Sequence, residues 1–491
     1  MSPQVDEETP LLQEQHHKPE RTPLPWFQFT IVLFLQLAEP LTSQVIYPFL
    51  PQLIRDIGIT QGDETKVGHY VGLLQSLFFL TQAMTVLHSC SQRLHHRSRH
   101  WSRISDSIGR KPVILIGLFG LSMSMYCFGL STTFWGLVFS RSLNGALNGN
   151  IGVIKSIMAE MTDATNIAQA YAYMPIAWST GGVLGPMIGG ALARPADQFP
   201  QLFGNNDFLK KYPYFLPCAV PATFSAIAWL VTFCFLKETV QAPTFALPKI
   251  FRFKSYTGKI SPVSEINDVT TEIPDNEKPV PFRKLLNRRV LIAAGNYATL
   301  SLVDITFRAI QPLFFSTPLE LGGLGLPPSS IGNLLSVFGL LNGVMQIFFF
   351  AQLHDYWGSK KTFIMGIAST VPIFICFPIL TYLVKSNGCI TPLAWMFVGL
   401  QIMLSLSISF SYGAIFIYIS AASPNRASLG ATNGLSQMTV SICRAIGPAA
   451  SNSLFSLSMR HHYMGGFLVY YVLLSISVLA LVAASMLPRQ V

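Results

Sequence analysis

The sequence predicts an all-α membrane protein with twelve transmembrane helices in two pseudo-symmetric halves of six. Hydrophobic residues make up 50% of the 491 residues and charged residues only 11%, whereas an average soluble domain carries about 25% charge. The apolar residues form blocks such as 113–130 and 362–384, which contain no charge and approach the ~20 residues needed to cross a bilayer. One long polar segment divides these blocks into two groups of six.

The predicted spans are apolar all round, whereas a helix of a soluble core would keep a polar face. Several exceed the minimum length, which a tilt in the bilayer accommodates. In chain order they lie near residues 27–50, 67–88, 112–131, 134–158, 168–192, 213–236, 289–314, 330–352, 361–384, 392–420, 427–456 and 465–487.

The dividing polar segment is rich in Pro, Lys, Glu, Asp and Ser, which is typical of a mobile tether, and it could also carry phosphorylation sites. Four regions follow from this division. They are a disordered cytoplasmic tail at 1–25, an N-terminal half at 26–239, a cytoplasmic linker at 240–288 and a C-terminal half at 289–491.

Lysine and arginine residues gather in alternate loops. They follow the second span, fill the linker and follow the eighth span at Lys360 and Lys361. Such loops face the cytoplasm, so an even number of spans places both termini there. Arg194, Lys210 and Arg460 on the opposite side are a minor exception.

Several function classes are excluded. The net charge of +10 comes from short connecting loops, where membrane topology explains it better than nucleic-acid binding. The 7 cysteines are scattered and predict neither a disulfide framework nor a metal site. No Gly-rich ATP-binding loop and no catalytic set is present. We therefore expect no enzyme and no cofactor; the partners are a small-molecule substrate, protons and the lipid bilayer, and the chain acts as a monomer.

Two equivalent loops, after spans two and eight, share a pattern that indicates an internal repeat. A glycine in such a loop permits a tight turn between two spans. An aspartate there can cap a helix N-terminus or form an ion pair with a basic side chain. The pattern Asp-x-x-Gly-x-Lys stands at Asp106, Gly109 and Lys111 and again at Asp355, Gly358 and Lys360.

The first of these loops, residues 101–112, resembles the loop signature of the major facilitator superfamily. The Asp, the Gly and the basic pair match, while Ser102 and Ser107 replace a glycine and a basic residue of the usual pattern. The resemblance implies that Asp106 and Arg110 help to lock the cytoplasmic face closed. The alternative is a plain loop anchored by its positive charge.

Span four carries Arg141, Gly145 and Gly149 at intervals of four residues. This spacing resembles a second motif of the family, whose arginine is tied to proton transfer. An arginine inside an apolar span is costly and indicates function, although one near a span end could reach the membrane surface. Asn144 and Asn148 extend the polar stripe along this helix.

Span five contains a glycine-rich stretch around a proline. Small residues at every fourth position let helices approach closely, and the proline removes a backbone hydrogen bond and bends the helix. The stretch resembles the motif that marks the antiporter branch of the family. Its residues are Gly181, Gly185, Pro186, Gly189 and Gly190.

Four further charges lie inside predicted spans. Glu39, in span one beside Pro40, is a candidate proton carrier because an acid at mid-span is expensive unless it is neutralised or faces water. Asp304 and Arg308 share one face of span seven, as an internal ion pair or as a coupling site. Arg444 in span eleven could contact an anionic substrate or pair with an acid such as Asp304.

Together the motifs resemble drug:proton antiporters of the tetracycline-resistance-like branch, close to fungal general-substrate and zinc-induced facilitator-like members. The resemblance implies secondary active transport, with proton-coupled export of a small organic solute by alternating access. The alternatives are a vacuolar carrier of organic anions or metal chelates, and a nutrient sensor that transports little. The short segment after span twelve disfavours a sensor.

Two features bear on location and on coupling. An acidic dileucine pattern, Glu7 to Leu12, is typical of sorting to a vacuolar or lysosomal membrane; the alternative is a disordered tail on a plasma-membrane protein. Residues 89–100 form an insertion relative to the family pattern, either genuine or a gene-model artefact. Its arginines disfavour metal binding by its three histidines.

Overall fold

A computed structural model describes residues 22–91, 108–148, 150–163, 166–239, 285–425 and 428–488. Four features predicted from the sequence lie wholly or mostly outside these residues: the dileucine pattern, Asp106, Gly149 and most of the linker. Residues 92–100 of the predicted insertion 89–100 lie outside them as well.

The first group of helices covers the residues before the linker. Apolar runs without charges set their lengths, and prolines and glycines set their ends. In chain order they are α1 (Trp26–Gln36), α2 (Ala38–Gln44), α3 (Leu50–Ile57), α4 (Val67–Ser91), α6 (Arg110–Leu130), α7 (Phe134–Leu147), α8 (Asn150–Met161), α9 (Ile167–Leu192), the short α10 (Pro195–Gln198), α11 (Pro200–Phe203) and α12 (Asp207–Lys211), and α13 (Phe215–Phe235).

The second group follows the linker. Its helices are α15 (Arg288–Ser316), α16 (Pro328–Phe348), α17 (Phe350–Ala368), α18 (Thr370–Asn387), α19 (Pro392–Ala422), α20 (Leu429–His461) and α21 (Leu468–Ser485). Short 3₁₀ turns, η1 (Glu64–Lys66), η5 (Leu319–Leu321) and η7 (Tyr463–Gly466), connect or extend some of them. The protein is therefore an all-α, multi-pass membrane protein.

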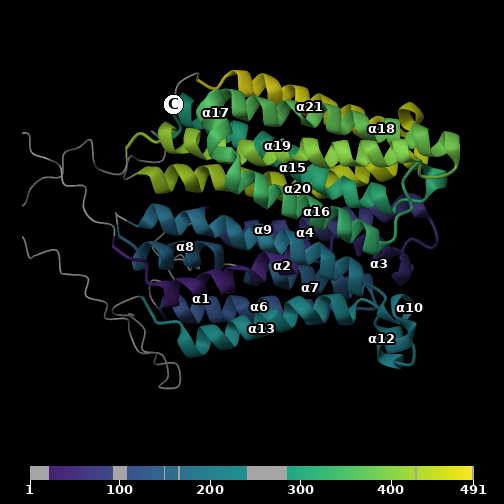
Figure 1. The fold of residues 1–491 in the computed structure, drawn as a ribbon, viewed down its shortest axis with the longest axis horizontal. Helices are drawn as coiled ribbons and strands as arrows, with labels where there is room; N and C mark the ends of the chain where they lie inside the picture. The colour runs from purple at the N-terminus through teal and green to yellow at the C-terminus, as the bar shows by residue number, and fades with distance from the viewer. Residues whose placement is uncertain are drawn as a thin grey trace, which may run out of the picture.

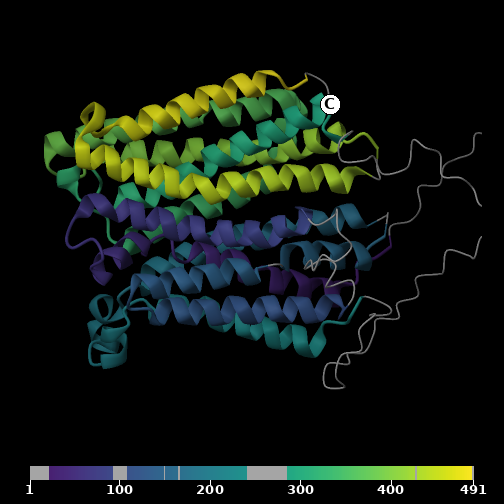
Figure 2. The ribbon, with the colours of Figure 1, turned by 180° about the vertical axis from the view of Figure 1, so that it is seen from behind.

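The helices run side by side along one axis, with the first group on one side and the second on the other (Figures 1 and 2). We call the end at which α1 and α15 begin the near end, and the end that holds α3, α10 and α12 the far end (Figure 1). The groups meet chiefly along two helix pairs, α4 with α20 and α9 with α16. The domain boundaries predicted from the sequence stay predictions.

Two predicted spans are interrupted. The first divides into α1, α2 and α3, with a turn over residues 45–49; Pro40, Pro48 and Pro51 each lack the N–H that a continuous helix needs. The fourth divides into α7 and α8, and Asn148 leaves the helical conformation (φ −81°, ψ 64°). Hydropathy does not reveal such breaks, because the residues on either side stay apolar.

Seven helical stretches of the described residues are long and apolar enough to cross a membrane, with α17 and α18 counted as one. Spans one and four are divided into shorter helices, and α4, α9 and α20 are not among the seven. Helix α17 has a kink at Gly358, whose φ/ψ values are not helical, so the part that forms span nine follows Gly358, close to the predicted start at residue 361.

Gly358 and Gly109 adopt similar backbone conformations, which supports the internal repeat. Their φ/ψ values are 74°/163° and 109°/156°, in a region that side chains disfavour. The end of the last span of each half also contacts this loop, although through different groups. The Glu238 carboxylate, after α13, accepts the backbone N–H of Arg110, and the Lys360 ammonium donates to the Ser485 carbonyl at the end of α21.

The two contacts between the groups are built alike. A Cβ on Gly72 of α4 would lie 2.6 Å from the Pro448 carbonyl of α20, and a Cβ on Gly332 of α16 would lie 2.4 Å from the Pro186 carbonyl of α9. One turn further, a serine hydroxyl bonds to the facing backbone in both pairs: Ser76 accepts from Ala449 N–H, and Ser336 donates to the Val183 carbonyl, each at 2.8 Å. Close backbone packing therefore joins the halves.

Candidate functional site

Glu39 lies on the seven-residue helix α2, opposite the break between α7 and α8. Its side chain is buried, and its Oε1 accepts a hydrogen bond from Asn148 Nδ2 at 2.8 Å. The interruption of span four therefore places an amide beside the acid. No cation of the described residues lies at ion-pair distance from this carboxylate, whose nearest charged influence is Arg444 of the other group.

The second acid, Asp304 on α15, is neutralised. Arg308, one turn along the same helix, donates from Nε to Asp304 Oδ1 at 2.8 Å, and the Tyr412 hydroxyl of α19 donates to Oδ2 at 2.9 Å. The Arg308 guanidinium also lies 5.1 Å from the centre of the Phe338 ring. Of the two alternatives from the sequence, the ion pair is the one formed in this structure.

Arg444 on α20 has only neutral hydrogen-bonding partners among the described residues. Its Nε donates to Ser301 Oγ at 3.2 Å, and it interacts with the Tyr412 hydroxyl. Asp304 is within electrostatic range, but its oxygens are already taken by Arg308 and Tyr412. The predicted pairing of Arg444 with an acid is therefore not formed at contact distance.

Arg141 on α7 is 4% exposed, and its Nε and Nη1 atoms have no hydrogen-bond partner among the described residues. Its guanidinium lies 4.8 Å from the centre of the Phe78 ring of α4, a favourable cation–π contact. Gly145, one turn away, packs against Phe78 as well, because a Cβ there would lie 2.3 Å from the Phe78 carbonyl. Buried groups of this kind without partners are rare and mark functional positions.

Tyr47, in the turn after α2, connects these groups. It is within electrostatic range of Arg141, Arg308, Arg444 and Asp304. Four of the five predicted coupling residues thus lie around one tyrosine, and the fifth, Glu39, is within electrostatic range of Arg444. The hydroxyl and amide partners, Asn148, Tyr412 and Ser301, complete the cluster.

The glycines of α9 pack against the broken first span. A Cβ on Gly181 would lie 2.6 Å from Pro40 Cβ, and one on Gly189 would lie 1.9 Å from the Val45 carbonyl. Gly185 meets Gln44 in the same manner, and Gly190 faces Pro328 of α16. The motif therefore fixes α9 against both the helix that carries Glu39 and a helix of the second half.

At the near end, Arg110 is held within its own half. Its guanidinium pairs with Glu160 of α8 at 2.8 Å, and the Glu238 oxygens accept the backbone N–H groups of Arg110 and Lys111 at 2.8 and 3.1 Å. Gly109 is required there, since a Cβ would lie 2.5 Å from a Glu238 oxygen. In the equivalent loop, the Asp355 side chain is 84% exposed and lies 3.6 Å from His354.

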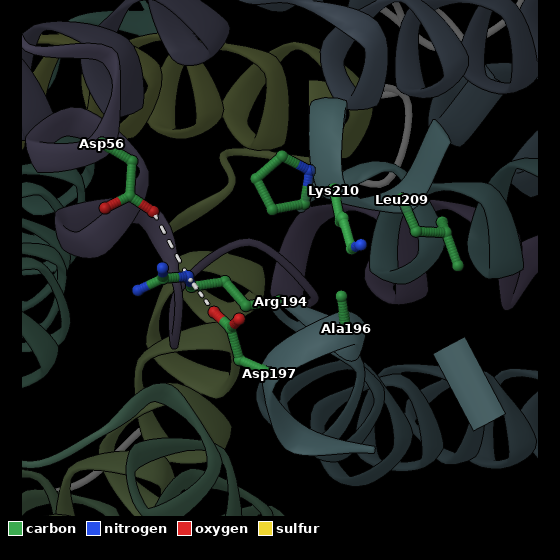
Figure 3. A pocket seen from close by; sticks show the side chains of 7 residues that line it. Asp56, Arg194, Ala196, Asp197, Leu209 and Lys210 are labelled. Carbon is green, nitrogen blue, oxygen red and sulfur yellow. Dashed lines mark ion pairs between the residues drawn. The ribbon is translucent and has the colours of Figure 1, made fainter. Parts of the chain in front are cut away.

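A polar cavity of about 370 Å³ lies at the far end (Figure 3). Arg194 is at its centre, 2.9 Å from Asp197 and 3.8 Å from Asp56 of α3. This cavity is separate from the Glu39–Arg444 cluster. Among the described residues, no group of three His, Cys, Asp or Glu side chains could hold a metal ion.

Comparison with known proteins places these features in a family. The sequence matches the family model described as Major Facilitator Superfamily over residues 32–448. It is 26% identical to the "Major facilitator superfamily multidrug transporter mfsB" of Aspergillus fumigatus, over 92% of this chain and 82% of that protein. It is 28% identical to "Protein ZINC INDUCED FACILITATOR 1" of Arabidopsis thaliana, over 91% and 89%.

The fold has solved relatives. A bacterial homologue of the human lysosomal transporter Spinster, in an inward-facing and occupied conformation, superposes with a TM-score of 0.63 at 13% identity, over 96% of this chain and 98% of that chain. At this identity the likeness concerns the fold alone.

Proposed function

The chain belongs to the Major Facilitator Superfamily of membrane transporters, and we propose that it is a proton-coupled antiporter that exports a small organic solute by alternating access. The multidrug transporter among its relatives supports solute efflux. The span-five motif, Gly181 to Gly190, supports the antiporter branch. Proton coupling is the finer part of the proposal and depends on the buried charges.

The contrast between the two acids carries the proposal. Asp304 has a guanidinium and a hydroxyl on its oxygens, so its charge is compensated within its own half. Glu39 has a neutral amide and no ion pair among the described residues, so no positive charge compensates its carboxylate at contact distance, and a bound proton can do so. We assign the exchangeable proton to Glu39. Arg141 belongs to the same polar stripe, and its positive charge helps the proton to leave.

The test is solute-driven proton movement in proteoliposomes that contain a pH-sensitive dye, with a panel of drugs, organic anions and metal chelates. Glu39→Gln should abolish proton flux, because the neutral amide mimics the protonated acid and has no proton to exchange. The matched control is Glu64→Gln, an acid at the far end that should retain full coupling. Proton flux that persists in Glu39→Gln would remove Glu39 from the mechanism.

The orientation belongs to the proposal too. Both termini face the cytoplasm, and the near end, where Arg110 and Asp355 lie, is the cytoplasmic end. There Asp106 and Arg110 form the inner gate, and the linker at 240–288 joins the two six-helix halves. Modification of single cysteines by an impermeant reagent at Gln61 (far end) and at Tyr356 (near end) tests this orientation from either side of the membrane.

A further inference from the structure

We infer that the solute is amphoteric: an aromatic molecule with an amino group that replaces the proton at Glu39 and an acid group that binds Arg444. The inference deepens the proposed function and rests on it in one respect, that Glu39 exchanges its proton when solute binds. It adds the chemical class of the solute and a role for Arg444.

Arg444 is an available anion site. Serine and tyrosine hydroxyls are its hydrogen-bonding partners, and no carboxylate of the described residues pairs with it. As a residue Arg444 is only partly buried, and none of its nitrogens is among the fully buried atoms without a partner. A guanidinium presents two parallel N–H donors to a carboxylate. An acid group of the solute would therefore supply the missing counter-charge.

Glu39 offers the complementary group. Asn148 occupies its Oε1, whereas Oε2 has no hydrogen-bond partner among the described residues and is not one of the fully buried unpaired atoms. An ammonium group could donate to this second oxygen. Glu39 comes from the first half and Arg444 from the second, and the two are within electrostatic range. A solute that bridges them would touch both halves at once.

Aromatic side chains lie near Arg444, because the Tyr297 and Tyr412 hydroxyls are within electrostatic range of it. Tyr297 of α15 packs edge-on against Tyr412 and Phe416 of α19, with ring centres 6.2 and 5.4 Å away. Phe416 is 48% exposed, and Tyr297 directs its hydroxyl to Gln437 of α20. Such a wall accepts a flat ring beside a charged end group.

Coupling chemistry selects an amphoteric solute over a simple anion. An anion at Arg444 would compete with the Glu39 carboxylate for the positive charge, so it would favour protonation of Glu39. Solute and proton would then bind together and move in the same direction. An amino group at Glu39 reverses this, because it replaces the proton, as exchange requires. The acid group then increases the affinity for the solute without preventing the exchange of solute for proton at Glu39.

The experiment measures equilibrium binding to the purified full chain in detergent. Three probes share one ring system: tryptophan carries both charges, tryptamine only the amine and indolepropionate only the acid. Wild type should bind tryptophan about tenfold or more tightly than either analogue, as expected for one extra charged hydrogen bond. Equal affinity for tryptophan and tryptamine, or no binding of any probe, would overturn the inference.

Variants assign each contact. Arg444→Gln should bind tryptophan no better than tryptamine, whereas Glu39→Gln should bind it no better than indolepropionate. Arg460→Gln removes the same charge from the exposed far end of α20 and should keep the wild-type order. If Arg444→Gln unfolds, Arg444→Lys should retain a weaker preference. A preference for tryptophan that survives in every folded Arg444 variant would remove Arg444 from the site.

The binding and transport experiments distinguish a failure of the amphoteric site from a failure of the antiport. Tryptophan preference without proton flux would leave the amphoteric site in place and overturn the antiport. Proton flux driven equally well by tryptamine would support the antiport and overturn the role of Arg444.

Discussion

At the residue scale, the two acids inside the membrane spans differ in their hydrogen-bonding partners. Glu39 has an amide and Asp304 a guanidinium as partner, although both lie on the first predicted span of their half. The pairing follows from position: Arg308 is four residues after Asp304 on an unbroken helix, where the two side chains meet. Glu39 has no base at that spacing, and its helix ends at Gln44.

Loss of either partner of the Asp304–Arg308 pair should destabilise the protein. Asp304→Asn leaves Arg308 without its counter-charge inside the membrane, which costs about 3 kcal/mol for a buried pair. The cost here falls at the low end because the Arg308 side chain is 32% exposed. The measurement is the melting temperature of the purified protein. The double variant Asp304→Asn, Arg308→Gln should recover part of the loss; a double variant that is less stable than Asp304→Asn would contradict the pair.

The sequence predicted the charged members of this cluster but not all of their partners. A charge inside an apolar span is conspicuous, so Glu39, Arg141 and Arg444 were identifiable. Tyr412 and Ser301 were not, because hydroxyls occur throughout these spans and only the packing of α15, α19 and α20 selects two of them. Whether the predicted residues act in transport is left to the experiments above.

At the element scale, helix α9 has two faces of small residues on which other helices pack closely. Gly181, Gly185 and Gly189 meet α2 and the turn after it, while the Pro186 carbonyl and Gly190 meet α16. The span-five motif therefore joins three elements rather than one pair. The matching contact of α4 with α20 had a signal in the sequence, Gly72-x-x-x-Ser76 against Gly332-x-x-x-Ser336, but it was not predicted.

A methyl group on the crowded face of α9 should be far more harmful than one on its open face. In Gly189→Ala the new Cβ would lie 1.9 Å from the Val45 carbonyl, so backbone has to move, at about 1–3 kcal/mol. Gly182→Ala is the matched control, since nothing lies within 4 Å of its Cβ. Melting temperatures and transport rates of both variants check this. Equal effects would mean that α9 does not pack against α2 as described.

The turn at Gly109 should be equally intolerant. Its φ of 109° and the Glu238 oxygen, which would lie 2.5 Å from an added Cβ, leave no room for alanine, and the strain costs about 1–3 kcal/mol. Gly295→Ala, on α15, where nothing lies within 4 Å, is the control. Lower stability of Gly109→Ala alone, measured by thermal unfolding, is the expected result. A Gly109→Ala protein as stable as the control would contradict the turn geometry.

Hydropathy could not predict where the membrane helices are interrupted. The predicted spans agree with the helices within a few residues wherever the chain is continuous, for example 168–192 against α9 (Ile167–Leu192). Spans one and four fail because a turn in a membrane is allowed only where protein covers it. The residues that pack against such a turn come from elements distant in sequence, as Asn148 does against Glu39. A local sequence pattern therefore does not predict the turn.

At the scale of the whole molecule, hydrogen bonds join the two groups of helices at the far end. The Arg55 guanidinium of α3 donates to Ser316 Oγ at 2.6 Å and to the Ser316 carbonyl at 2.9 Å, at the end of α15. His69 Nδ1 of α4 and Ser453 Oγ of α20 are 2.8 Å apart. These contacts favour a conformation that is closed at the far end.

The hydrogen bonds between Arg55 and Ser316 therefore hold the far end closed, and their removal should open it. Arg55→Gln loses two hydrogen bonds of a charged donor, worth about 1–3 kcal/mol together near the surface, which shifts a two-state equilibrium about fivefold or more. Spin labels at Gln61 and Glu320, both exposed and in opposite halves, report the opening by pulsed electron resonance. Arg55→Gln should increase the population of long distances.

Glu64→Gln provides the control, because Glu64 binds Arg55 Nε at 2.8 Å within the same half and leaves both bonds to Ser316 in place. Its distance distribution should stay close to that of wild type. If Arg55→Gln and Glu64→Gln give the same distribution, the bonds between Arg55 and Ser316 do not hold the far end. The glycine contacts of α4 with α20 and of α9 with α16 would then be sufficient to keep it closed.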